Sequence, residues 1–147
     1  MMNSKQYNRY VARLSPKSKV WKNVCFAFLI GGAICTLGQL LLVAFGAVGL
    51  DKDTAGTATS CALVFLSALT TGLSWYDDLA KLGGAGTLVP ITGFANGVVS
   101  SAIEARTEGW ILGIGTKIFT IAGPVILYGT AASMVYGILY YFWTLFR

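Results

Sequence analysis

Two long runs without a charged residue constrain this chain more than any other feature. They cover residues 24–50 and 118–146, and each is longer than the about 20 residues that an α-helix needs to cross the hydrocarbon core of a bilayer. A third, weaker run covers residues 54–76 and is rich in Ala, Ser and Thr, which helix interfaces inside membranes favour. Since a chain in lipid must satisfy its own backbone hydrogen bonds, these runs predict an all-α integral membrane protein with about three full transmembrane helices.

The composition and the basic N-terminus indicate how the chain is organised. Hydrophobic residues make up 55% of the 147 residues and charged residues 12%, against about 25% charged in a typical soluble domain. We therefore divide the chain into a basic cytoplasmic arm, residues 1–23, and a single transmembrane domain, residues 24–147. By the positive-inside rule, the excess of basic residues in the arm predicts a cytoplasmic N-terminus. These residues are Lys5, Arg9, Arg13, Lys17, Lys19 and Lys22.

The arm itself has the pattern of a short amphipathic helix. Tyr7, Tyr10, Val11 and Leu14 recur at helical spacing, which predicts a basic helix that lies on the membrane and ends before Pro16. The apolar run that follows is too long for a secretory signal peptide, so we expect an uncleaved anchor. Beside a transmembrane segment, the partner of such an arm is anionic lipid rather than nucleic acid.

Few residues of this chain are suited to catalysis or to metal binding. There is no histidine, the commonest general base and metal ligand. Cys25, Cys35 and Cys61 match no metal or redox spacing, and we expect them to be small buried hydrophobic residues. Asp77 and Asp78 are adjacent but lack further ligands nearby, which favours an interfacial turn. The sequence predicts no enzyme activity, no catalytic residue, no metal site and no cofactor.

The stretch 83–97 is rich in glycine, too broken for a helix and too apolar for an ordinary surface loop. Irregular backbone inside a membrane must lie against protein or line a cavity, because lipid offers it no hydrogen bonds. We expect a broken, Gly-rich central element of two half-helices, residues 92–108 and 109–123, with Pro124 dividing the last run near its start. The sequence leaves open whether this element crosses the bilayer or re-enters, and therefore on which side the C-terminus lies.

The central element is also the candidate solute site. A helix capped by Thr92 would present the N–H groups of Thr92, Gly93 and Phe94, and its positive dipole end, to a carboxylate-bearing solute. Asn96 could hydrogen-bond such a solute and Phe94 could stack on a flat ring. The alternative is a glycine-rich elbow that only lets helices pack. The candidate substrate or pore residues are Gly84, Gly86, Pro90, Thr92, Gly93, Phe94, Asn96, Ser101, Glu104 and Gln39.

The first half-helix is expected to have a polar and an apolar face. Helical spacing places four residues on the polar face and three on the opposite one. Two interpretations stay open for the polar face: an interfacial helix with its acidic side in water, or a stripe that lines a pore. The polar set is Gly97, Ser101, Glu104 and Glu108, and the apolar set is Val99, Ile103 and Ala105.

Three segments of the chain closely resemble one known family. They are VCFAFLIGGAICTLGQ at 24–39, GAGTLVPITGFAN at 84–96 and AIEARTEG at 102–109. Together they resemble the stage V sporulation protein AC family, and the similarity extends over about residues 7–137. The sister family AE-b shares the central motif but usually lacks the long basic arm, which favours AC.

The resemblance implies a multi-pass subunit of a complex in the spore inner membrane. Such proteins help to move dipicolinic acid, pyridine-2,6-dicarboxylate, often as its calcium chelate, into the developing spore and out at germination. The implied partners are the AE-b sister and the soluble AD protein, and the AC family is linked to mechanosensitive channel behaviour.

Three functional hypotheses follow from the chain and its resemblance. We expect a gated, passive channel subunit in a homo- or hetero-oligomer, because 147 residues are few for enclosing a pore. A scaffold subunit of the complex and a mechanosensitive channel of low solute selectivity stay open as alternatives. Also open is whether the solute binds as an anion at a helix end or passes as the less charged calcium chelate.

Overall fold

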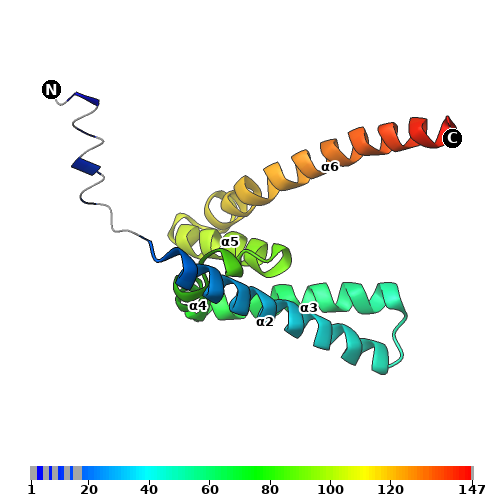
Figure 1. Ribbon diagram of the computed structural model, residues 1–147, viewed down its shortest axis with the longest axis horizontal. Helices are drawn as coiled ribbons and strands as arrows, with labels where there is room; N and C mark the ends of the chain where they lie inside the picture. Colours follow the sequence, from blue (N-terminus) through cyan, green and yellow to red (C-terminus); the bar gives the residue numbers. More distant parts are fainter. Residues whose placement is uncertain (1–2, 5–6, 8–9, 12–13, 15–17, 147) are drawn as a thin grey trace.

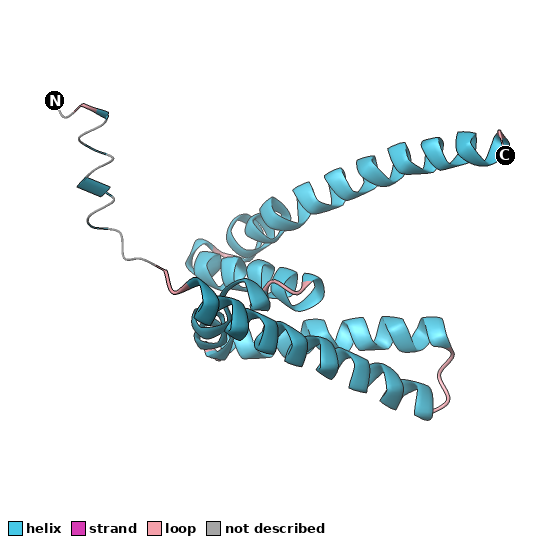
Figure 2. Ribbon diagram, viewed as in Figure 1, coloured by secondary structure: helices cyan, strands magenta, loops and turns pink. Residues whose placement is uncertain are grey.

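The computed structural model describes residues 3–4, 7, 10–11, 14 and 18–146, and the regular structure in this part of the chain is all helical (Figures 1 and 2). Three helices are long and apolar enough to cross a membrane, at Val20–Ala47, Lys52–Gly72 and Trp110–Leu145. The predicted all-α membrane protein with three long spans is therefore confirmed. In chain order the elements are α2 (Val20–Ala47), α3 (Lys52–Gly72), α4 (Trp75–Gly83), η1 (Gly84–Thr87), α5 (Pro90–Glu104), η2 (Ala105–Glu108), η3 (Trp110–Gly115) and α6 (Thr116–Leu145).

The predicted helix in the arm is described only in part. Tyr7, Tyr10, Val11 and Leu14 are helical and exposed. The basic residues of the arm up to position 17, and Pro16, lie outside the described residues. The amphipathic basic helix and its contact with lipid stay predictions.

The helices α2 and α3 form an antiparallel hairpin (Figure 1). The turn between them contains Gly49 at φ 97°, a backbone conformation that favours glycine. Asp51 then caps α3, because its carboxylate accepts hydrogen bonds from the backbone N–H of Thr54 at 3.1 Å and from its hydroxyl at 2.6 Å. These two bonds, the side-chain bond first, hold the pKa of Asp51 below its usual value.

The central element enters and leaves at one end of the hairpin. After α4 the chain passes along α2 through η1, turns, and returns as α5 beside α3 (Figure 1). The helix α5 has 15 residues, which at 1.5 Å per residue is about 22 Å long and shorter than a hydrocarbon core of about 30 Å. The start of α2, the end of α5 and the start of α6 all lie at this end (Figure 1).

The bounds of the two half-helices differ from the sequence prediction. The first begins at Pro90, with Val89 rather than Thr92 at the cap position, because the fixed φ of proline suits the first helical residue. It ends at Glu104, where four residues of 3₁₀-helix and Gly109 at φ 96° turn the chain. The second runs through a π-helical turn into α6 without a break, and α6 continues through Pro124.

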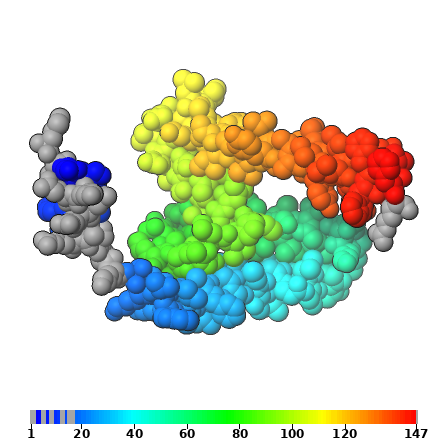
Figure 3. All heavy atoms as spheres, turned by 45° about the horizontal axis from the view of Figure 1, so that its top comes forward, coloured from blue at the N-terminus to red at the C-terminus, as the bar shows by residue number. Residues whose placement is uncertain are grey.

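Most apolar side chains of this chain face outward. The buried residues lie in α3, α4, η1, α5, η2 and η3, whereas α2 and α6 have none. The helix α6 packs on α5 and η3 and then stands away from the hairpin (Figures 1 and 3). Such an apolar exterior is typical of a surface that meets lipid or other membrane helices.

The prediction that the cysteines are buried is wrong. All three, Cys25, Cys35 and Cys61, are unpaired and exposed on α2 and α3. The physical reason is that each long helix meets protein along a narrow strip only, so a small apolar residue elsewhere on it faces outward.

Candidate functional site

Gly86 brings the backbone of η1 directly onto α2. A Cβ added at this position would lie 2.6 Å from the Cα of Ala27 and closer still to its carbonyl oxygen. On the other side of the contact, a Cβ on Gly31 would lie 3.0 Å from the carbonyl oxygen of Gly86. These two glycines therefore have a packing role.

Other predicted glycines of the stretch also serve the turn. Gly84 has φ 48°, in the left-handed region that favours glycine. A Cβ on Gly93 would lie 3.0 Å from the carbonyl oxygen of Thr87, and the Gly93 N–H already donates to the carbonyl of Val89 at 2.7 Å. One of the three N–H groups assigned to a solute is thus occupied inside the helix. Phe94 is partly exposed on α5.

Thr92 is placed differently from the prediction. It is the third residue of α5 rather than its cap, only 6% exposed, and its hydroxyl has no hydrogen-bond partner. Its carbonyl oxygen accepts from the hydroxyl of Ser67 at 2.7 Å. This bond ties the start of α5 to the last third of α3.

One turn further along, Asn96 makes a second tie between these helices. The hydroxyl of Thr71 donates to Oδ1 of Asn96 at 2.9 Å and also lies 2.6 Å from the carbonyl oxygen of Ser67. Asn96 therefore holds α5 against α3, and the rest of its amide is open to a neighbouring cavity.

That cavity, which we call the polar hollow, lies between α3, α4 and α5. Its volume is about 410 Å³. It brings together two of the predicted site residues, Asn96 and Glu104, and adds four polar residues that the sequence prediction missed. The lining residues are Thr71, Ser74, Asp77, Ala80, Asn96, Ser100, Ile103 and Glu104.

The charges of the polar hollow come from two carboxylates on different helices. Glu104 is the last residue of α5, and Asp77 lies in the first turn of α4. The ammonium of Lys81 lies 2.8 Å from Asp77 and 3.0 Å from Asp78, and these carboxylates raise the pKa of Lys81 to about 12. Lys81 therefore offsets charge on α4, while Glu104 has no ion pair among the described residues.

The face of α5 that meets the polar hollow differs from the predicted polar face by a rotation of about one residue along the helix. The hollow receives Asn96, Ser100 and Glu104, at spacing i, i+4 and i+8, whereas Ser101 is absent from its lining. Ile103, placed on the apolar face by the sequence, lies at its edge. The signal that would have found Ser100 is this spacing from Asn96, which the sequence prediction did not use.

Two further predicted residues lie away from the hollow. Gln39 is exposed on α2, outside the lining of the polar hollow. Glu108 is exposed in η2. Of the ten candidate residues, the structure thus brings Asn96 and Glu104 together in the polar hollow, while Gly84, Gly86 and Gly93 shape the turn beside it.

The chain is similar to known sporulation proteins along most of its length. The family model described as SpoVAC/SpoVAEB sporulation membrane protein matches residues 23–139. The "Stage V sporulation protein AC" of Bacillus subtilis (strain 168) is 40% identical over 143 residues, which cover 95% of this chain and 94% of that protein. No solved structure matches the chain.

Proposed function

Since this chain belongs to the SpoVAC/SpoVAEB family of sporulation membrane proteins, we propose that it is a membrane subunit of a complex that moves dipicolinic acid, with calcium, across the spore inner membrane. The observation that carries the proposal is the polar hollow where the central element returns to the end of the hairpin. A membrane protein with a mostly apolar surface has little reason to keep Asn96, Ser100 and Glu104 on one short helix unless they meet water or a solute.

The charges of the hollow favour the calcium chelate over the free dianion. Dipicolinate carries two carboxylates, which Asp77 and Glu104 in the lining would repel. Calcium prefers oxygen ligands, and the hollow offers carboxylate, amide and hydroxyl oxygens. The helix-end anion site has less support, because the N–H of Gly93 is already bonded to Val89. We therefore propose that the chelate is the species transported.

The pore itself would be shared with other subunits. The helix α6 stands away from the hairpin (Figure 1), and no residue of it is buried. We propose that the AE-b sister, or further copies of this chain, cover the apolar surfaces and complete the conduit, and that the soluble AD protein joins the complex from outside the membrane. With a cytoplasmic N-terminus, three full spans would place the C-terminus on the opposite side, which leaves the central element re-entrant.

Release of dipicolinic acid from germinating spores tests this function. Spores whose only copy of the subunit carries Glu104→Gln or Asn96→Leu should release dipicolinic acid about two- to fivefold more slowly, the range expected for losing one exposed charge contact or one hydrogen bond. Release is followed by terbium fluorescence, and the calcium released is measured alongside it. Glu108→Gln, an exposed carboxylate outside the hollow, is the matched control.

The same experiment separates the channel from the scaffold. Immunoblots of spore membranes establish that each variant subunit is present at the normal level. Release that is unchanged in Glu104→Gln and in Asn96→Leu, at normal levels, would favour the scaffold. Reconstituted vesicles that hold the whole complex and are loaded with calcium dipicolinate provide the direct measurement of flux.

A further inference from the structure

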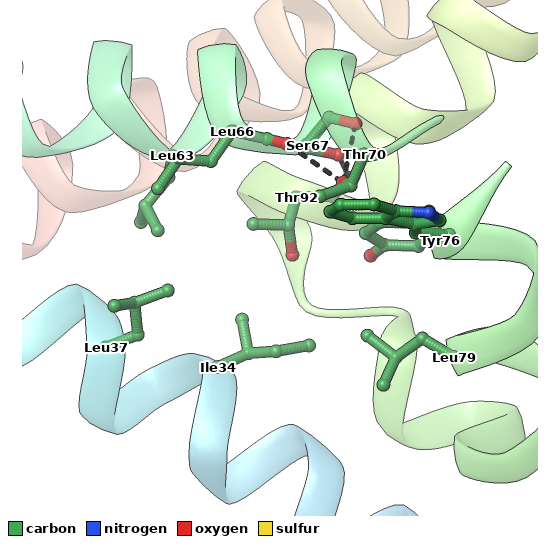
Figure 4. A pocket seen from close by; sticks show the side chains of 10 residues that line it. Ile34, Leu37, Leu63, Leu66, Ser67, Thr70, Tyr76, Leu79 and Thr92 are labelled. Carbon is green, nitrogen blue, oxygen red and sulfur yellow. Dashed lines mark hydrogen bonds between the residues drawn. The ribbon is translucent and has the colours of Figure 1, made fainter. Parts of the chain in front are cut away.

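A second cavity lies beside the start of α5, apart from the polar hollow. We call it the apolar cavity; it has a volume of about 300 Å³ and lies where α2, α3, α4 and α5 meet (Figure 4). Thr92, at the start of α5, is part of its wall. The lining residues are Ile34, Leu37, Leu63, Leu66, Ser67, Thr70, Trp75, Tyr76, Leu79 and Thr92.

The walls of this cavity are aliphatic and aromatic, and none of its lining residues is charged. Leucine and isoleucine side chains from α2 and α3 face each other across it (Figure 4). Tyr76 is 5% exposed and its hydroxyl donates to the carbonyl of Thr87 at 2.8 Å. The ring of Tyr76 is therefore held in place as a wall, and its hydroxyl is already used.

Thr92 carries a buried hydroxyl of the cavity that lacks a partner. Its hydroxyl points into the space above α2 (Figure 4) and is fully buried without a hydrogen bond. Besides Tyr76, the other two hydroxyls of the lining also donate: Ser67 to the carbonyl of Thr92 at 2.7 Å, and Thr70 to the carbonyl of Leu66 at 2.8 Å. A buried hydroxyl without a partner costs free energy, so a ligand that pairs with it gains affinity.

The position of Thr92 in its helix explains why it has no partner in the protein. Most threonines inside the long helices bond to the carbonyl four residues earlier, as Thr36 and Thr59 do at 2.8 Å each. For Thr92 that carbonyl belongs to Leu88, which precedes the helix start at Pro90. The usual internal bond is therefore lost at this one buried threonine.

We propose that the apolar cavity binds a small, uncharged, mostly apolar molecule with one hydroxyl group, which pairs with Thr92. The volume is at the lower end of the range for small-molecule sites. A charged ligand such as dipicolinate would lose its hydration among uncharged walls. A plain hydrocarbon chain would leave Thr92 unpaired, and a water molecule needs two to four polar partners. The ligand is thus of a different class from the solute of the proposed function.

Such a ligand can reach the cavity from the membrane. Leu37, Leu66 and Trp75, which line the cavity, are also exposed on the outside of the helices. The cavity therefore opens sideways, toward the region where an apolar alcohol concentrates by partition into lipid.

Photolabelling with an alcohol tests the proposal. The purified full chain in lipid nanodiscs is labelled with an octanol that carries a diazirine, and the labelled residues are mapped by mass spectrometry. We expect saturable labelling of α2 and α3 residues around the cavity, competed by unlabelled octanol. Thr92→Val should weaken competition about two- to tenfold, as for loss of one hydrogen bond, and Thr92→Ser should restore it. Labelling of the exposed surface of α6 serves as the measure of non-specific partition.

Two controls make the result decisive. Thr59→Val removes another buried threonine hydroxyl, whose bond lies within α3 and outside the cavity, and it should leave competition unchanged. Ile34→Phe fills the cavity without altering Thr92 and should abolish the saturable labelling. The proposal is overturned if labelling is not competed, if it persists in Ile34→Phe, or if Thr92→Val and Thr59→Val behave alike. None of these measurements involves dipicolinate flux, so the proposed function is tested separately.

Discussion

Replacing Gly86 by alanine tests whether the backbone contact between η1 and α2 holds the central element in place. The added Cβ would lie 2.6 Å from the Cα and 2.7 Å from the carbonyl carbon of Ala27. Both are backbone atoms, so no side-chain rotation can relieve the overlap. To bring the Cα of Ala27 to an ordinary contact of 3.4 Å, the two segments must separate by about 0.8 Å, and its nearer carbonyl oxygen requires a larger separation.

The energetic consequence follows from that displacement. Overpacking by one methyl group in a tight contact costs about 1–3 kcal/mol, and a gap of 0.5–1 Å elsewhere in the contact forfeits about a quarter to a half of the dispersion attraction. Gly32→Ala is the matched control, since a Cβ there meets nothing within 4 Å. In a helix interior this control should gain about 0.5–1 kcal/mol. The two variants should therefore differ by roughly 1.5–4 kcal/mol.

Reversible unfolding in mixed detergent micelles, followed by circular dichroism, measures this difference. Because the overlap involves the backbone of Ala27, the second substitution Ala27→Gly should not rescue Gly86→Ala. Equal stability of Gly86→Ala and Gly32→Ala, or rescue by Ala27→Gly, would refute the reasoning.

Three further predictions concern the ties of the hairpin and the topology. Ser67→Ala should lower the unfolding free energy by about 0.5–1.5 kcal/mol more than Ser60→Ala in the same micelle assay, because Ser67 bonds to another helix and Ser60 to its own. The lowered pKa of Asp51 means that its stabilising effect is complete above about pH 4 and is lost as the pH falls below that value. In an acid titration followed by circular dichroism, Asp51→Asn should lack this loss of stability below about pH 4. An identical loss of stability in Asp51→Asn and in the unsubstituted chain would contradict the prediction. A reporter fused to the C-terminus should lie on the opposite side of the membrane from one fused to the N-terminus; the same side for both would exclude a re-entrant central element.

Features that depend on local composition were predictable from the sequence. The three long helices are set by runs of apolar residues, because a chain in lipid has no other way to satisfy its backbone. The polar turn before α3 follows from Asp51 and Thr54, three residues apart. The irregular backbone around Gly84 and Gly86 was likewise visible in the glycine content, since few other residues tolerate such turns.

The face of α5 that meets the rest of the protein was harder to predict. Successive side chains of a helix differ by about 100° in direction. The prediction named Ser101, whereas its neighbour Ser100 lines the polar hollow. The hydrogen bonds from α3 to Thr92 and Asn96 fix which face of this helix meets α3.

The sequence by itself determined that this chain is a helical membrane protein of the sporulation family, with three spans and a broken centre. The tertiary structure alone decided that Gly86 rests on Ala27, that Asn96 and Glu104 share a hollow with Asp77, and that Thr92 is left without a partner. The physical reason is that lipid acts on each segment separately, whereas these contacts join residues of different helices and depend on how the helices are rotated and how deeply the central element enters.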